Sequence, residues 1–169
     1  MTELELALHT AEELTKPWGK NLTRPENNRL DVVIEASDLI SAVQGLLEAH
    51  WGYLAAISGL DRPAPVAAEG EPQGENAIEA LYTFCSGSCV LNLRVSVPYS
   101  MPNLPTVCGL IPSATLYERE LMEMFGVLID GTPDTSRLIL ADAWPKGVYP
   151  LRKSFTGTSP ADAMEGASQ

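Results

Sequence analysis

Apolar residues in the first sixty positions follow two different spacings. Where they recur every three or four residues among polar ones they predict one face of a helix, whereas β-branched runs predict strands. The elements predicted in this way are a helix near 4–14, a polar loop through 28, a strand at 30–36, a helix that Ser37 caps and Gly52 ends, and a strand at 53–60. This order places helices beside a sheet.

The centre of the chain carries a hairpin pattern. Two apolar-rich runs, at 78–85 and 89–97, flank the tripeptide Ser86-Gly87-Ser88. A glycine there permits the positive φ of a tight turn, so we predict two antiparallel strands joined at Gly87. The preceding segment, near 61–76, is rich in Pro, Ala, Gly and Glu and is predicted to be a mobile surface loop.

The last third predicts one helix and then an extended segment. Ser113 is expected to cap a helix over 114–125 that Gly126 ends, and a short strand at 127–129 follows. The domain boundaries predicted from this pattern are an α+β domain over 1–130, an extended C-terminal arm over 131–155 and a disordered tail over 156–169. The predicted fold class is therefore α+β, with an antiparallel or mixed sheet, helices on one face and the extended arm. Leu138, Ile139 and Leu140 are expected to anchor the arm.

Charge and composition exclude several functions. The formal net charge of -11 gives a polyanionic surface that repels phosphate backbones, so nucleic acid is not an expected partner. The acidic start lacks the basic region of a signal peptide, and no apolar run approaches the roughly 20 residues of a transmembrane helix. The 3 cysteines are odd in number and few, which favours a reducing, cytoplasmic compartment.

The residues that could carry chemistry form no recognisable site. Cys85 and Cys89 are spaced Cys-x-x-x-Cys, but a zinc or iron-sulfur site needs four ligands and the chain has no second pair, which favours cysteines that fill the core. His9 and His50 lack a nucleophile motif, and no glycine-rich phosphate loop is present. We therefore predict no catalytic, cofactor-binding or metal-binding residue on this chain.

Four segments in fixed order are the most specific feature. They are Tyr-Glu-Arg-Glu-Leu-Met-Glu-Met-Phe-Gly-Val at 117–127, Gly-Thr-Pro-Asp at 131–134, Arg-Leu-Ile-Leu at 137–140 and Tyr-Pro-Leu-Arg-Lys-Ser-Phe at 149–155. This series resembles the 30-kDa subunit family of respiratory complex I, which is shared with energy-converting membrane-bound nickel-iron hydrogenases. The chain departs from the family pattern at Thr132, at Thr135-Ser136 and at Ser154, where the family usually has His, Leu-Arg and Asp. The spacing at 144–149 is closer to the hydrogenase branch.

The resemblance implies a structural and assembly role. A member of this family would bind the large catalytic subunit, the homologue of the 49-kDa or the hydrogenase large subunit, beside iron-sulfur subunits. It would itself carry no cofactor, because the iron-sulfur clusters and any nickel-iron centre belong to partner subunits. It would contact the membrane arm only indirectly, peripheral to the inner face of the cell membrane.

The arm has the residue types of an interface, since aromatic and Arg side chains dominate binding surfaces. The predicted partner-binding residues are Glu118, Arg119, Glu120, Phe125, Arg137, Trp144, Tyr149, Leu151, Arg152, Lys153 and Phe155. Three alternatives stay open: the arm packs back on its own domain with its Arg residues in internal salt bridges; the chain is a separate redox or metal protein that uses Cys85 and Cys89; or it is an adaptor for an unrelated acidic protein.

Overall fold

The computed structural model describes residues 2–66 and 70–157. Its elements in chain order are α1 (Glu3–Thr15), β1 (Asn21–Glu26), β2 (Arg29–Ile34), the 3-10 helix η1 (Ala36–Asp38), α2 (Leu39–Glu48), β3 (Tyr53–Arg62), β4 (Ala77–Ser86), β5 (Cys89–Pro98), β6 (Asn103–Pro105), α3 (Ala114–Phe125) and β7 (Leu128–Asp130). The tail predicted to be disordered, 156–169, lies outside the described residues except for its first two positions. The elements form an α+β fold, as predicted.

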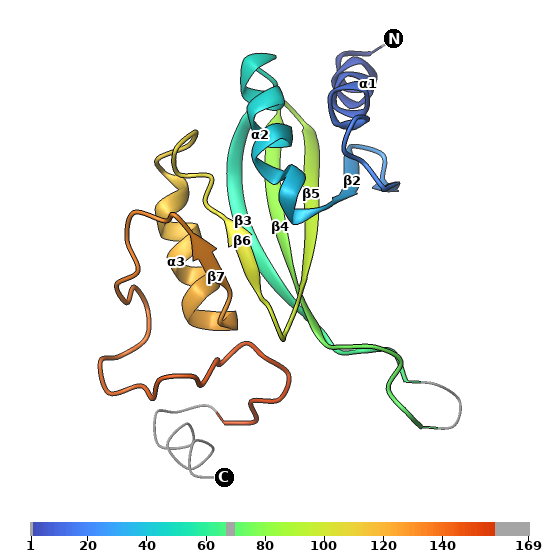
Figure 1. Cartoon of the computed structure of the whole chain (residues 1–169). Coiled ribbons are helices and arrows are strands. Elements are labelled where there is room, and N and C mark those ends of the chain that lie inside the picture. The colour runs from blue at the N-terminus through green and yellow to red at the C-terminus, as the bar shows by residue number, and fades with distance from the viewer. Residues whose placement is uncertain (1, 67–69, 158–169) are drawn as a thin grey trace.

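The five-stranded sheet has the order β1-β2-β5-β4-β3. The pair β2 and β5 is parallel and the other three pairs are antiparallel, so the sheet is mixed. Helices α1 and α2 lie over one face of it (Figure 1). Helix α3 packs on that same face beside β3, where the ring of Phe125 lies against Gly59 so closely that a Cβ there would come within 2.4 Å of it. The prediction of helices on one face is confirmed.

The predicted hairpin is present with its turn at Gly87. Ser86 of β4 pairs with Cys89 of β5, so that Gly87 and Ser88 form a two-residue connection. Gly87 has a φ of 59°, the left-handed conformation that glycine adopts without a steric penalty. This turn fixes the register of the two central antiparallel strands.

Three local predictions were wrong. The polar loop expected through residue 28 contains strand β1, whose six residues are all exposed. It pairs with β2 through the backbone at the sheet edge, so its side chains carry no burial pattern. Neither Ser37 nor Ser113 caps a helix through its side chain: Ser37 lies in η1, and Ser113 precedes α3 without a capping hydrogen bond.

The loop predicted near 61–76 is more ordered at its ends than expected. Strand β3 extends to Arg62, and Val66 and Pro72 form an isolated antiparallel bridge. The backbone N–H of Ala64 donates to the side chain of Asn76 (2.8 Å), which joins the two sides of the loop. The mobility of the segment stays a prediction.

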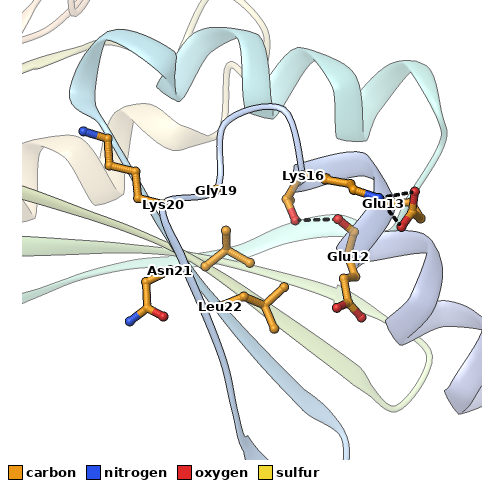
Figure 2. Close-up of a pocket in the computed structure, with 9 residues that line it drawn as sticks. Glu12, Glu13, Lys16, Gly19, Lys20, Asn21 and Leu22 are labelled. Carbon is orange, nitrogen blue, oxygen red and sulfur yellow. Dashed lines mark hydrogen bonds and ion pairs between the residues drawn. The ribbon is translucent and has the colours of Figure 1, made fainter.

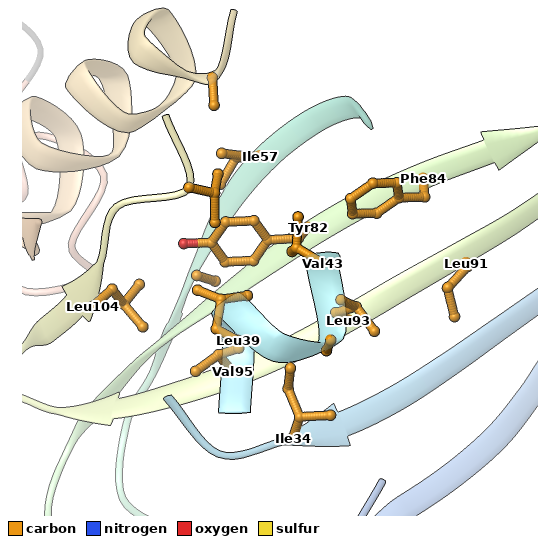
Figure 3. Packing of buried hydrophobic residues seen from close by; sticks show 14 of the residues in the cluster. Ile34, Leu39, Val43, Ile57, Tyr82, Phe84, Leu91, Leu93, Val95 and Leu104 are labelled. Atoms are coloured by element: carbon orange, nitrogen blue, oxygen red, sulfur yellow. The ribbon is translucent and has the colours of Figure 1, made fainter. Parts of the chain in front are cut away.

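The hydrophobic core lies between the sheet and its helices. Tyr82 and Phe84 of β4 are fully buried, and side chains of α2 such as Leu39 and Val43 point onto them (Figure 3). Burying one such side chain contributes about 1.5–3 kcal/mol of hydrophobic free energy. Since successive strand residues point to opposite faces, the residues between these ones form the other face of the sheet.

That outer face carries a row of alternating charges across four strands. Asp31 of β2 accepts hydrogen bonds from Arg29 (2.7 Å) and from Arg94 of β5 (3.1 Å). Glu79 of β4 accepts from Arg94 (2.8 Å) and from Arg62 of β3 (2.7 Å). Only 2% of Asp31 and 8% of Glu79 remain exposed, so the arginine side chains cover the carboxylates. The row thereby satisfies buried charges on a face that no described helix covers.

The same contacts set the pKa of both acids. Burial by itself raises the pKa of Asp31, but its hydrogen bonds with Arg29 and Asn92 and the charge of Arg94 outweigh that effect and lower it. The pKa of Glu79 is lowered in the same manner by Arg94 and Arg62. A depressed pKa in the folded state stabilises the fold above the unfolded pKa of about 4, and this contribution is lost as the pH falls through the folded value.

We predict that Asp31→Asn lowers the free energy of unfolding at pH 7 by about 1–3 kcal/mol, because two arginines lose their counter-charge. The variant should also lose less stability than the wild type as the pH falls from about 5 to about 3. Urea unfolding at a series of pH values measures both effects. The matched control is Asp142→Asn, at an exposed acid that makes no hydrogen bond or ion pair within the described chain. Equal curves for Asp31→Asn and the wild type would contradict the prediction.

Candidate functional site

The residues predicted to bind a partner lie on α3 and on the arm that follows it. Helix α3 has the predicted bounds, and Gly126 ends it with a φ of 72° while its N–H bonds the carbonyl of Met122 (3.0 Å). Figure 1 shows the arm running from β7 around α3 and back beneath it. The arm therefore folds along its own domain.

Glu118 is the acid of α3 that faces inward. It is fully buried, and its carboxylate accepts hydrogen bonds from the Thr106 hydroxyl (2.8 Å), the Val107 N–H (2.8 Å) and the Cys108 thiol (3.2 Å). It thus anchors the segment before the helix and is not available to a partner, which corrects the expectation for this residue. Helical spacing was the missed signal, because Glu118 lies three positions before the buried Leu121.

Arg119 holds the beginning of the arm. Its guanidinium donates to the carbonyl of Ser136 (2.9 Å), to the Ser136 hydroxyl (3.0 Å) and to the carbonyl of Arg137 (2.8 Å). It also pairs with the carboxylate of Asp134 (3.1 Å). Arg119 therefore acts within the chain, and its side chain satisfies backbone groups that no strand or helix satisfies.

Glu123 completes this attachment. Its carboxylate accepts the backbone N–H groups of Leu138 (2.9 Å) and Ile139 (2.8 Å). These bonds fix the arm next to α3 and leave the side chains of Leu138 and Ile139 exposed by 40% and 56%. Leu140, in contrast, is partly buried against the core. The expectation that Leu138 and Ile139 anchor the arm by burial is wrong, since their backbone provides the anchor.

The Tyr-Pro-Leu-Arg segment docks on the C-terminal end of α3. The guanidinium of Arg152 lies between the rings of Tyr99 and Tyr149, 4.2 Å and 4.5 Å from their centroids. It also donates to the carbonyl of Phe125 (2.7 Å), which satisfies one of the free carbonyls at the helix end. Stacking on two aromatic rings and hydrogen bonding to a carbonyl are contacts that lysine cannot reproduce together.

Asp61 at the end of β3 binds the same segment. It accepts from the Tyr99 hydroxyl and from the backbone N–H of Lys153 (2.7 Å). Burial, reinforced by the bond to Asp61, raises the pKa of Tyr99 to about 12, so Tyr99 stays a hydrogen-bond donor at neutral pH. The sheet, α3 and the arm therefore meet in one polar cluster.

The middle of the arm has a small core of its own. Trp144 is buried, its ring packs against Phe155 with centroids 5.7 Å apart, and its indole N–H donates to the carbonyl of Val148 (2.9 Å). Arg137 donates to the carbonyl of Trp144 (2.6 Å). The alternative that the arm packs on its own chain is thus what the structure shows for the arginines at 119, 137 and 152, although their contacts are mostly backbone carbonyls and not carboxylates.

The surface left for a partner differs from the predicted set. Among the predicted residues, those at 118, 125 and 144 are buried and those at 119, 137, 149, 152 and 155 are half-buried, whereas Glu120, Leu151 and Lys153 are exposed. Further apolar side chains are exposed near them, namely Leu116 (52%) and the pair at 138–139. Whether these side chains contact a partner stays a prediction.

The cysteine pair does not converge in this geometry. Cys89 pairs with Ser86 across the hairpin and so shares its face of the sheet, whereas Cys85 precedes Ser86 and points to the opposite face. Cys89 is buried in the core, and that burial raises the pKa of its thiol, which disfavours the reactive thiolate. The arrangement opposes a shared metal ion or a disulfide between the two.

A hollow of about 350 Å³ lies between the end of α1 and β1 (Figure 2). The charged groups that line it already have partners: the acids at 12 and 13 pair with Arg24 (2.6 Å) and Lys16 (3.2 Å), and Lys20 pairs with Glu35. It offers no convergent set of free polar groups, so we do not assign it a ligand.

Comparison with known proteins decides the family. Residues 32–161 match the family described as respiratory-chain NADH dehydrogenase, 30 Kd subunit. The chain belongs to this family. It is 32% identical over 127 residues to formate hydrogenlyase subunit 5 of Escherichia coli, which covers 75% of this chain and 21% of that protein. It is 39% identical over 88 residues to an NADH-quinone oxidoreductase subunit of Rhizobium rhizogenes, covering 52% and 43%.

The hydrogenase branch is represented as well. Membrane-bound hydrogenase subunit beta of Pyrococcus furiosus is 42% identical over 67 residues, which is 40% of this chain and 39% of that one. The chain therefore spans between about a fifth and about two fifths of the length of these relatives. All three are named as subunits of larger assemblies, and homology to them supports a place for this chain in a complex of that kind.

Solved structures share the fold. A trypsin-resistant fragment of Nqo5 superposes with a TM-score of 0.59 at 26% identity and covers 79% of this chain and 99% of that fragment. A chain of the membrane-bound sulfane sulfur reductase, an archaeal respiratory membrane complex, superposes with a TM-score of 0.64 at 19% identity, covering 99% and 93%. The second likeness concerns the fold alone. Within the described residues, no helix has the length and apolar character needed to cross a bilayer.

We predict that Gly126→Ala releases the arm. The added Cβ would lie 2.3 Å from the ring of Tyr149, in a left-handed backbone conformation that itself costs about 1–2 kcal/mol for alanine. Displacing Tyr149 removes one side of the Arg152 stack, so trypsin should cleave after Arg152 and Lys153 at least about tenfold faster. Limited proteolysis with mass spectrometry measures this.

The control for that experiment is Gly109→Ala. A Cβ at Gly109 meets no atom within 4 Å, so this variant should be cleaved at the wild-type rate. If Gly126→Ala is also cleaved at the wild-type rate, the contact between Gly126 and Tyr149 does not hold the arm.

Proposed function

We propose that this chain is a cofactor-free structural subunit in the peripheral arm of a complex I-like or membrane-bound nickel-iron hydrogenase complex, and that it binds the large catalytic subunit. Family membership supports the first part of this statement. The exposed side of α3 and of the arm supports the second. In this function the chain clamps and positions its neighbour, and the redox chemistry takes place on other subunits.

The observation that carries the proposal is the use of the polar groups of the arm. Arg119, Glu123 and Arg152 bind the arm to its own domain, so its backbone is ordered before any partner arrives. Apolar side chains are left on the outside, and exposed apolar groups beside polar ones mark protein interfaces. A pre-ordered surface also avoids the entropy loss of ordering a loop upon binding.

The lengths of the relatives support a large neighbour. The segment that resembles this chain is 21% of formate hydrogenlyase subunit 5 and 12% of an NADH-quinone oxidoreductase subunit of Methylococcus capsulatus. The name of the second protein joins the letters of two subunits. A unit that occurs in one chain with a larger part in some relatives is expected to contact the equivalent of that part when it is a separate chain.

The remaining features of the proposal follow from the family resemblance. Iron-sulfur subunits would lie next to the large subunit, and their clusters and any nickel-iron centre would belong to those partners. The chain would reach the membrane arm only through them, on the cytoplasmic face. Nucleic acid is not an expected partner, because the net charge is -11.

The test is co-purification of the large subunit with the tagged chain from its native membranes. We predict that Leu138→Asp combined with Ile139→Asp lowers the recovery of the large subunit at least about tenfold, since two charges would be buried against an apolar surface. Because both side chains are exposed, the free energy of unfolding of the variant should stay within about 0.5 kcal/mol of the wild type.

The control variant is Leu6→Asp, at a leucine of α1 that is 52% exposed and lies far from the arm along the fold (Figure 1). It should recover the large subunit at the wild-type level. Recovery by the double variant equal to that of the control would disprove the proposed interface, provided that both proteins are folded.

A further inference from the structure

Helix α3 carries three glutamates, and the structure gives them different roles. Glu118 accepts three hydrogen bonds in the interior, and Glu123 accepts backbone N–H groups of the arm. Glu120 is exposed, and its carboxylate makes no hydrogen bond or ion pair with any residue in 2–66 or 70–157. Of these three acids, Glu120 alone keeps its full capacity to accept hydrogen bonds from another molecule.

A hollow of about 240 Å³ lies next to Glu120, between α3 and β3. Its lining residues are Ala56, Ile57, Ser58, Gly59, Tyr117, Glu120, Leu121, Phe125 and Leu151. Small-molecule sites usually measure about 300–1,000 Å³, so this hollow has the size of a side chain and not of a cofactor. Glu120 is the one charged residue in the lining, and the other walls are apolar, aromatic or hydroxyl-bearing.

One wall of the hollow is the outer edge of the sheet. Strand β3 ends the strand order, so its edge away from β4 has unpaired backbone groups in the described structure. The Tyr117 hydroxyl donates to the carbonyl of Ala55 (3.0 Å), which shows that a carbonyl of this strand accepts hydrogen bonds from side chains here. A donor that enters the hollow therefore finds backbone carbonyls as well as the Glu120 carboxylate.

Taking the proposed function as its basis, we propose that this hollow receives the side chain of an arginine or lysine from the large catalytic subunit. The hydrocarbon stem would pack on Tyr117 and Leu151, and the cationic group would pair with Glu120. An apolar side chain would leave the Glu120 carboxylate desolvated without a partner, and an acidic one would be repelled. The net charge of -11 attracts a basic partner segment over a longer range.

The first experiment compares Glu120→Gln and Glu120→Lys in the tagged full-length chain, purified from native membranes over a series of NaCl concentrations. We expect Glu120→Gln to lower recovery of the large subunit about fivefold, and Glu120→Lys to lower it at least about thirtyfold, because the second change places two cations together. Matched controls are Glu71→Gln and Glu71→Lys, at an exposed acid on the loop that projects away from α3 (Figure 1), and both should recover the large subunit as the wild type does.

The outcomes separate this inference from the proposed function. If the wild-type chain recovers no large subunit, the proposed function fails. If the wild type recovers it, Leu138→Asp with Ile139→Asp abolishes recovery and Glu120→Lys does not, the interface stands and the side-chain pocket is disproved.

A photo-crosslinking amino acid at Leu116 identifies the occupant directly. Leu116 lies one helical turn before Glu120 and is 52% exposed, so the probe sits beside the hollow without filling it. A captured peptide of the large subunit that contains Arg or Lys supports the inference. A captured peptide without either residue overturns it.

Discussion

A segment without helix or strand has no regular ladder of hydrogen bonds, so each of its buried backbone groups needs another partner. Most of the arm over 131–155 is such a segment, and the charged side chains of α3 meet this need. Arg119 binds carbonyls at 136 and 137, and Glu123 binds the next N–H groups. Without this exchange the arm would have no fixed path, and no side chain on it would have a fixed position.

Gly126 makes the second half of this attachment possible. It allows α3 to end in a left-handed turn, and its missing side chain lets the ring of Tyr149 lie directly on the backbone. Arg152 then fits between two tyrosines and reaches the last carbonyl of the helix. The Phe-Gly and Pro-Leu-Arg segments, which carry the family resemblance, are therefore two sides of one contact inside the chain.

This internal use of the motif separates two tasks along the chain. Residues that carry the family resemblance position the arm, while we assign recognition to side chains left outside, such as Leu138, Ile139 and Glu120. The outer face of the sheet shows a different solution, in which Asp31 and Glu79 are closed off by arginines from adjacent strands. Charges on that face are already paired, whereas Glu120 beside the arm is free to accept a donor within the described structure.

Elements whose signals are local could be predicted from the sequence. Apolar spacing located α1, α2 and α3, the glycine at 87 located the hairpin turn, and the four ordered segments indicated the family. The candidate site was located only as a region, because the residue types of the arm do not show which polar groups are used internally. Strand β1 has six exposed residues and exists because β2 offers it a backbone edge. Glu118 and Glu120 are two positions apart, yet one is buried and the other free, because their surroundings come from residues distant in sequence. Periodicity reports the face of an element, whereas the partner of a polar side chain depends on contacts that form only when the chain folds.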